Sequence, residues 1–317
     1  MLSLNKDVWT CITLELSNRD KVNISSICLS SRFLVQILDF NDCVRASKII
    51  NLPYKFKNIC IDNSMDHIKI LQPSTITHMK FSYNFNSEIK FIIPNSVVHL
   101  VFGYKFNKII HNGQIPNSVV HLVFGHNYNK PITDCIPTSV THLTLGREFK
   151  KSICGHIPLS VTHLVLKCVN LILSKNDIPL SVTHLTLDYS FNFNNSMQNC
   201  IPLSVTHLIL AYYSNININD MIPSSVTHLT LHCVYELLLE SDVPNSVTHL
   251  TLSDNYGLYG HGLWSSDYIS TSVTHLVLDT KIISLPFIPP SVKFLKIRSI
   301  YAGKYNIPNT VNTVEWI

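Results

Sequence analysis

The sequence of 317 residues predicts a solenoid of about 13 short parallel β-strands, preceded by a small α-helical domain. The first observation is a ten-residue stretch, IPLSVTHLTL at residues 178–187, which recurs in close copies from about residue 92 to the C-terminus. The second is the period, because the prolines that open eight copies are 21 to 23 residues apart. The third is that residues 1–48 lack the repeat. A constant period of this length indicates stacked units of one kind.

Each copy of the repeat carries the same apolar pattern. Apolar residues lie three, six and eight positions after the opening proline, as at Val182, Leu185 and Leu187. This L-x-x-L-x-L spacing is typical of leucine-rich coils, in which one short strand per coil joins a parallel sheet. Alternation along the strand sends Leu185 and Leu187 to one face and His184 and Thr186 to the other. A unit of this size cannot bury its own apolar face, so the leucines must form a core that stacked coils share.

The same template finds degenerate copies at both ends of the repeat region, which bring the number of strands to 13. Their leading residues are Pro53, Pro73, Ser270, Pro289 and Pro308. We therefore divide the chain into a helical domain at residues 1–48, a degenerate first repeat and junction at 49–72, and a repeat solenoid at 73–317. In the turn that opens each copy, Ser181 and its equivalents are expected to bond their own local backbone.

Composition and charge argue against several classes of protein. Charged residues make only 14% of the chain, and a formal net charge of +4 is too small and scattered for a nucleic-acid-binding surface. No apolar run reaches the length of about 18 residues that a membrane-spanning helix needs. The nine cysteines include no CxxC pair, and the sequence shows no signal peptide, so we expect a reduced, cytoplasmic protein. We expect no nucleic-acid partner, no membrane partner and no cofactor.

Residues 1–48 have the spacing of short helices. Asp7, Val8, Ile12 and Leu16 follow a helical period, and further helices are expected over 22–28, 31–38 and 41–49. The simplest role of such a domain is to cover the open core of the first coil, because terminal repeats need a cap.

The stretch LNKDVWTCITLELSNRDKVNISSICLSSRF at residues 4–33 resembles the F-box motif. Its apolar positions match those of the motif at Leu4, Val8, Trp9, Ile12 and Leu16. Asn5 stands where F-boxes carry proline, and the residues after Cys28 also depart from the motif. The resemblance implies that the five apolar side chains bind a Skp-type adaptor of a cullin ubiquitin ligase. Two interpretations remain open for residues 1–48: an adaptor-binding F-box, or a cap for the solenoid alone.

An aromatic residue followed by asparagine recurs twelve and thirteen positions after the proline. It occurs at Phe85–Asn86, Phe106–Asn107, Tyr128–Asn129 and Phe191–Asn192. With the Ile-Pro that follows, this pattern resembles the FNIP repeat, a leucine-rich-repeat-like family, over about residues 53–317. We expect the ring to fill the rear of the core and the asparagine to bond backbone in the adjacent coil. The combination of an F-box with FNIP repeats is typical of amoebae and their giant viruses. The resemblance implies that the repeats hold an unknown target protein for ubiquitination.

Ten of the 16 histidines occupy one repeat position, directly before the first leucine of the strand. They should form a column on the sheet face opposite the core, about 4.8 Å apart, neutral at pH 7 and bonded to neighbouring threonine and histidine. A metal site needs ligands that converge, and parallel imidazoles do not converge. Catalysis needs a nucleophile or acid beside an oriented base, and threonine is the only repeated neighbour. We therefore expect no metal site, no catalytic residue and no enzyme activity.

The column two positions further along the strand holds mostly valine and threonine, as at Val165 and Thr186. An apolar stripe beside the histidines is either a partner-binding surface or the result of β-propensity. The candidate partner-binding face joins eight histidines to a tryptophan in the longer unit at 244–269, whose loop is expected to protrude. These residues are His99, His121, His142, His163, His184, His207, His228, His249 and Trp264.

Overall fold

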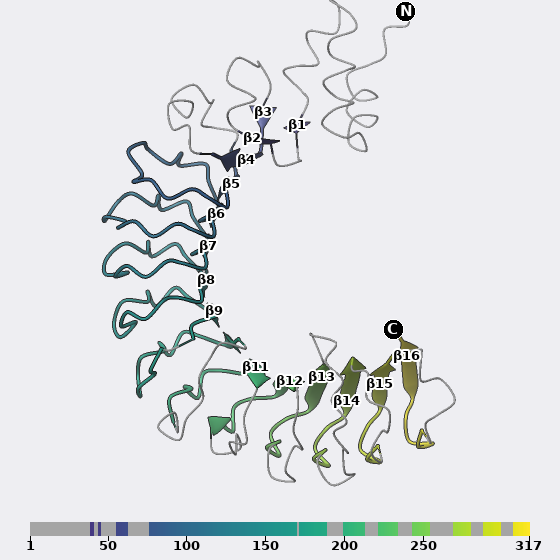
Figure 1. The fold of residues 1–317 in the computed structure, drawn as a ribbon. Helices are drawn as coiled ribbons and strands as arrows, with labels where there is room; N and C mark the ends of the chain where they lie inside the picture. The colour runs from purple at the N-terminus through teal and green to yellow at the C-terminus, as the bar shows by residue number, and fades with distance from the viewer. Residues whose placement is uncertain are drawn as a thin grey trace, which may run out of the picture. The chain divides into compact units, whose positions relative to one another are not determined.

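A computed structural model describes residues 39–40, 44–45, 55–62, 76–169, 171–188, 199–212, 221–233, 243–253, 269–279, 288–298 and 307–317. The chain divides into two compact units, Met1–Val140 and Thr141–Ile317, called here the first and the second unit. Within each unit, coil stacks on coil, with one strand per coil from β5 onward (Figure 1). The described residues contain no α-helix.

The described part of the first unit contains seven short strands. They are β1 (Asp39–Phe40), β2 (Val44–Arg45), β3 (Lys55–Phe56), β4 (Asn58–Ile61), β5 (His78–Phe81), β6 (His99–Val101) and β7 (His121–Val123). β1 pairs with β3 in a small parallel sheet. β2, β4, β5, β6 and β7 pair in that order in a second sheet, which is also parallel.

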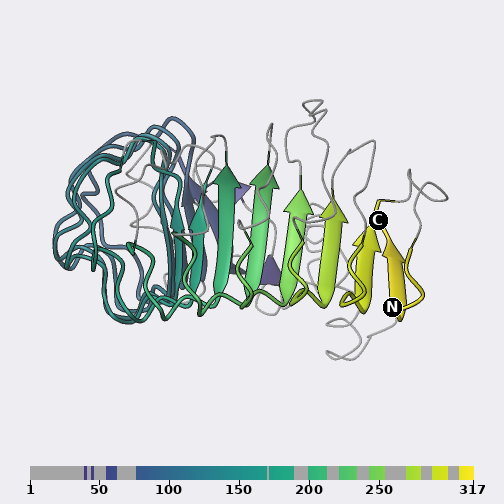
Figure 2. The ribbon, with the colours of Figure 1, turned by 90° about the horizontal axis from the view of Figure 1, so that it is seen from below.

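The described part of the second unit contains nine strands. They are β8 (His142–Leu145), β9 (His163–Leu166), β10 (His184–Leu187), β11 (His207–Tyr212), β12 (His228–Cys233), β13 (His249–Ser253), β14 (His275–Asp279), β15 (Phe294–Ile297) and β16 (Thr313–Trp316). Each pairs in parallel with the next, side by side in one sheet (Figure 2). β4 to β16 are the 13 strands that the repeat predicted, so the parallel, leucine-rich-repeat-like solenoid is confirmed.

The strands pair in a register that stacks equivalent residues of successive coils. Leu185 of β10 lies beside Leu164 of β9 and Leu208 of β11. Leu185 and Leu187 are at most 1% exposed, whereas Thr186 on the opposite face is half-buried. The predicted assignment of the two faces is therefore confirmed. We call the face opposite the core the open face of the sheet.

The turn before each strand is closed by its proline and serine. The carbonyl oxygen of Pro179 accepts a 3.1 Å hydrogen bond from the backbone N–H of Val182, and equivalent turns recur in other coils. The Ser181 hydroxyl donates at 2.8 Å to the carbonyl oxygen of Val161 in the preceding coil. The expected local bond of Ser181 was therefore wrong. Serine ties one coil to the coil before it, and the same bond is made in six further coils.

The rear of the first unit is filled by the predicted aromatic residues. Phe85, Phe106 and Tyr128 are fully buried, with neighbouring ring centroids 6.0 Å apart. Asn107 links three coils, because its backbone N–H donates to Oδ1 of Asn86 at 2.9 Å and its own Oδ1 accepts from the Asn129 N–H at 3.0 Å. The aromatic rear wall and the asparagine ladder are thus confirmed in this unit. The pair at residues 191 and 192 lies outside the described residues.

Ring spacings show that the coils of the first unit curve. Centroids of neighbouring histidine rings on the open face are 4.1 to 4.2 Å apart. The Phe81, Phe102 and Phe124 rings, deeper in the core, are 5.1 and 5.5 Å apart, and the rear rings are 6.0 Å apart. The coils therefore approach most closely at the open face, which lies on the inside of the curve.

Two glycines permit close backbone contact between neighbouring coils just after the strands. A Cβ atom at Gly103 would lie 1.9 Å from the carbonyl oxygen of Ser82, and one at Gly125 would lie 1.9 Å from that of Gly103. The backbone of neither glycine has a positive φ. The contact between coils, rather than the backbone angle, therefore requires glycine at both positions.

The start of the chain differs in part from the prediction. A helix was expected over 41–49, but Val44–Arg45 forms β2 and pairs with β4, so that Val44 lies beside Ile59. The sheet thus begins one strand before the first predicted coil, because an extended segment can satisfy the edge of β4. The residues assigned to the helical F-box-like domain up to position 38 lie outside the described residues, and that assignment stays a prediction.

Candidate functional site: the histidine ladder of the open face

Histidine rings stack in an unbroken run along the second unit. The run comprises His142, His163, His184, His207, His228, His249 and His275. Neighbouring centroids are 4.0 to 4.1 Å apart and the ring planes lie within 16° of parallel. The run ends at Phe294, which occupies the histidine position of the next coil. Its ring centroid is 5.6 Å from that of His275, and the two ring planes are tilted by 31°. In the first unit, His78, His99 and His121 form a shorter stack of the same kind.

A threonine directly before each ladder histidine of the second unit holds its ring. Oγ1 of Thr183 lies 2.9 Å from Nδ1 of His184 and 3.4 Å from the carbonyl oxygen of Thr162. The hydroxyl either donates to Nδ1, or accepts from a protonated Nδ1 and donates to the carbonyl. The same pair of contacts recurs in most coils of this unit. Threonine thus suits both the neutral and the protonated imidazole, and Nε2 is left as the second hydrogen-bonding atom of the ring.

Burial and neighbouring imidazoles both oppose protonation of five of the ladder histidines. The pKa values of His207, His228 and His249 are lowered first by burial and then by neighbouring imidazoles of the ladder. The pKa values of His78 and His99 in the first unit are lowered for the same two reasons. For these five histidines the directions are those expected of neutral rings at pH 7.

The column beside the ladder is uncharged from β8 to β14. It consists of Thr144, Val165, Thr186, Ile209, Thr230, Thr251 and Val277. These side chains are half-buried, and the first charged residue of the column is Lys296, which pairs with Glu315 at 3.3 Å. The open face of the second unit therefore presents two regular columns, one of imidazoles and one of small apolar and hydroxyl side chains.

Neither a metal centre nor a catalytic cluster is found in the part of the chain that the structure describes. It contains no group of three or more histidine, cysteine or carboxylate side chains arranged to hold a metal ion. Stacked parallel rings direct their nitrogens the same way, and a metal needs ligands that converge. Over the same residues, no helix is long and apolar enough to cross a membrane.

The structure brings together part of the predicted partner-binding face. His99 and His121 stack in the first unit, and the six predicted histidines from His142 to His249 stack in the second. Trp264 lies outside the described residues. So do all five predicted adaptor-binding residues, which are Leu4, Val8, Trp9, Ile12 and Leu16.

The first unit carries a second stack of rings that the sequence pattern did not predict. The rings of Tyr83 and Tyr104 are 4.5 Å apart, and those of Tyr104 and His126 are 4.2 Å apart. Each lies five positions after a ladder histidine, so the repeat period alone would have aligned them. Tyr83 is 58% exposed, and this short stack therefore forms an aromatic edge to the open face.

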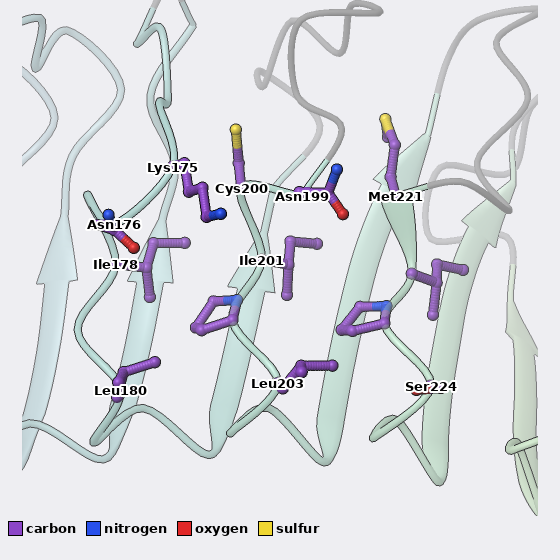
Figure 3. A pocket seen from close by; sticks show the side chains of 13 residues that line it. Lys175, Asn176, Ile178, Leu180, Asn199, Cys200, Ile201, Leu203, Met221 and Ser224 are labelled. Carbon is purple, nitrogen blue, oxygen red and sulfur yellow. The ribbon is translucent and has the colours of Figure 1, made fainter.

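A shallow pocket of about 470 Å³, lined by both apolar and polar residues, lies on the turns of the second unit (Figure 3). Equivalent residues of neighbouring coils line it, with Ile178 and Leu180 on one coil and Ile201 and Leu203 on the next. Leu180 and Leu203 are 75% and 70% exposed. The pocket is built from repeated turn residues, and its lining offers no base, acid and nucleophile arranged for catalysis.

Comparison with known proteins supports the repeat assignment. The model of the FNIP repeat matches residues 69–105, 106–146, 128–168 and 193–234. The chain is also similar to CroV588, whose crystal structure is described as a novel circular LRR protein structure, with 26% identity and a TM-score of 0.56. That similarity covers 88% of this chain but 48% of CroV588, so the chain spans about half the length of that protein. The comparison with curated proteins gave no match.

Fold, repeats and structural likeness together define a solenoid protein of the leucine-rich-repeat-like class. Within that class, the repeats at residues 69–168 and 193–234 match the FNIP repeat, whose aromatic-asparagine and Ile-Pro signatures the sequence carries. Solenoids of this type generally act as protein-interaction scaffolds and are generally not enzymes.

Proposed function

We propose that this chain is a protein-interaction scaffold that binds a target protein on the open face of its sheet. The observation that carries the proposal is the pair of regular columns on β8 to β14, where half-buried histidines stand beside an uncharged stripe of threonine and valine. Solenoids commonly use such extended, repeated surfaces for binding. A surface that offers many small contacts over several coils suits a protein partner better than a small molecule, which needs an enclosed pocket.

We propose further that the chain is the substrate-recognition subunit of a Skp/cullin/F-box type ubiquitin ligase in the cytoplasm. The support is the F-box-like spacing of Leu4, Val8, Trp9, Ile12 and Leu16, which would contact a Skp-type adaptor. Catalysis would then belong to partner subunits, and the solenoid would hold the target. The alternative is a repeat protein without a link to ubiquitin, in which residues 1–48 only cap the solenoid. Asn5 and the departures after Cys28 favour that alternative.

Capture of a purified Skp-type adaptor by the full-length chain separates the two functions. A ligase subunit should retain the adaptor, and Ile12→Asp with Leu16→Asp should abolish retention because charge is placed on the apolar contact surface. A matched control places two charges on exposed turn leucines, Leu180→Asp and Leu203→Asp, and should retain the adaptor. The far-UV circular dichroism of both variants must match that of the parent, which shows that the solenoid has folded. Retention by the folded Ile12→Asp, Leu16→Asp variant, or no retention by the parent chain, would favour the cap.

A further inference from the structure

We propose that the histidine ladder of the second unit binds an extended acidic segment of a partner protein and takes up protons as it binds. The inference rests on the proposed scaffold function and names the chemistry of the target that the open face would recognise. It does not depend on the ubiquitin ligase role.

The geometry of the ladder supplies a line of equivalent binding groups. From His142 to His275, seven imidazoles follow one another at 4.0 to 4.1 Å. Nδ1 of His184 and of its equivalents is held by a threonine hydroxyl, which fixes the ring. A protonated ring can keep this bond by donating from Nδ1, because the hydroxyl then turns to the carbonyl oxygen of the preceding threonine. The scaffold therefore accepts a charged ring without rearrangement.

Within the described residues, the surroundings of the ladder supply little negative charge to pair with it. Charged and titratable side chains on or beside the same strands lie at the strand ends or beyond the ladder. They are Lys167, Asp188, His232, Asp279, Lys293, Lys296, Arg298 and Glu315. Three pairs among them are Lys167 with Asp188 at 3.8 Å, Arg298 with Asp279 at 2.5 Å, and Lys296 with Glu315 at 3.3 Å. The negative charges of Asp188 and Asp279 raise the pKa of His232, but burial has the larger effect and lowers it.

Ligand binding must therefore supply the countercharge for a protonated ladder. Without a ligand, burial and then repulsion between imidazoles about 4 Å apart lower the pKa values of His207, His228 and His249. A carboxylate placed against two or three rings favours their charged form, so the pKa of those rings rises on binding. Since the bound state then holds more protons than the free state, affinity must increase as the pH falls.

An acidic peptide fits this face better than a nucleic acid does. Nucleic-acid-binding surfaces depend on clustered lysine and arginine that remain charged at neutral pH, and the column beside the ladder has none from β8 to β14. Its methyl groups, as at Val165 and Thr186, instead suit contact with an extended peptide. Acidic side chains on one side of an extended peptide would reach the rings while its backbone lies against this stripe.

The test measures binding of a labelled ten-residue peptide of alternating aspartate and serine to the full-length chain by fluorescence anisotropy. At constant ionic strength, we expect the peptide to bind at least about tenfold more tightly at pH 5.5 than at pH 7.5. A peptide of alternating asparagine and serine should bind weakly at both values. Absence of binding at pH 5.5, or affinity that does not change with pH, would overturn the proposal. Stronger binding of a single-stranded oligonucleotide than of the acidic peptide would overturn it as well.

Matched variants locate the effect on the ladder. Replacing His184, His207 and His228 with glutamine keeps a polar side chain of similar length but removes the titration, and most of the pH dependence should be lost. Replacing two histidines outside the ladder, His111 and His156, should leave the pH dependence unchanged. If the triple variant does not fold, NMR titration of the parent chain decides instead. Addition of the acidic peptide should raise the ladder pKa values, and an unchanged or lowered pKa would contradict the inference.

The two proposals fail separately. A chain that retains the Skp-type adaptor but shows no acid-strengthened peptide binding would overturn this inference alone. A chain that binds the acidic peptide through the ladder but does not retain the adaptor would overturn the ligase role and leave the ladder site in place.

Discussion

The two faces of β10 share one backbone, yet different forces hold their side chains. On the core face, Leu185 and Leu187 are at most 1% exposed and stack on equivalent leucines of the neighbouring coils. Burying one such side chain contributes about 1.5–3 kcal/mol. On the open face, His184 and Thr186 are only half-buried, and the ring of His184 is held by stacking and by Thr183.

This difference explains why the same residue recurs on each face. Repetition of leucine follows from a core that every coil must share, because one coil cannot close its own. Repetition of histidine does not follow from burial, since β-propensity alone would allow many residues on an open face. A ring that must stack on an identical ring, and a threonine that bonds it, account for the pattern. The core face thus supports stability, and the open face is left with ordered, accessible polar atoms.

The largest expected effect is on the core face. Leu185→Ala should lower the free energy of unfolding by about 2–5 kcal/mol, because it removes buried methyl groups and leaves a cavity between coils. Thr186→Ala on the open face of the same strand should cost less than about 1 kcal/mol. Urea denaturation followed by circular dichroism measures both. Equal costs at the two positions would show that burial does not separate the faces.

The next effect tests how closely coils approach in the first unit. Gly103→Ala should destabilise by about 1–3 kcal/mol, because its Cβ would meet the backbone oxygen of Ser82 and force the coils apart. Ile92→Ala, at a residue 87% exposed in the same unit, should stay within about 0.5 kcal/mol of the parent. A neutral Gly103→Ala would mean that the neighbouring coil shifts without cost.

Much of the fold was predictable from the sequence because the repeat states the same pattern many times. The 13 strands, the inward leucines, the aromatic rear wall and the asparagine ladder all followed from period and alternation. The coil-to-coil bond of Ser181 was missed because local turn chemistry does not show that a neighbouring carbonyl lies within reach. The strand Val44–Arg45 was missed because a two-residue strand has no periodicity, and only pairing with β4 creates it.

The candidate site was predictable as a column but not in its spacing. Flat strands suggest about 4.8 Å between successive rings. The observed 4.1 Å between His99 and His78 is shorter, while the rear rings of Phe85 and Phe106 are 6.0 Å apart, so the coils curve. Curvature arises because neighbouring coils are closer together at the open face than at the rear. The residue pattern of a single strand gives no information on that difference in spacing. Thr183 can bond both neutral and protonated His184 because its hydroxyl also lies near the carbonyl oxygen of Thr162 in the preceding coil. That distance is set by the stacking of the coils and is not visible in the sequence.

A smaller effect concerns the threonines that hold the ladder. Thr183→Val should cost about 0.5–1.5 kcal/mol, because the Nδ1 contact of His184 and the link to Thr162 are lost together. The first unit provides the matched case, since Val98 precedes His99 and that ring still stacks. Thermal denaturation should therefore show a modest loss without unfolding, and Val98→Thr should be neutral or stabilising. A large loss in Thr183→Val would indicate that stacking depends on the hydroxyl.

The smallest effect per residue is the loss of stability in acid, because the ladder rings are partly exposed to solvent. The pKa values of His207, His228 and His249 lie below the ordinary value of 6.5, through burial and then neighbouring imidazoles. A folded pKa below the unfolded one means that the unfolded chain binds more protons as the pH falls. The ladder's contribution should therefore be complete above about pH 6.5 and decline below it, gradually, because neighbouring sites titrate together. Thermal denaturation from pH 7.5 to 5.5 should show this decline as a falling melting temperature. Replacing His207 and His228 with glutamine should make the melting temperature depend less on pH. The control chain, with His111 and His156 replaced instead, should keep the pH dependence of the parent. A melting temperature that rises as the pH falls would mean that the folded chain already pairs its imidazolium ions with negative charge, and that the open face needs no acidic partner to charge it.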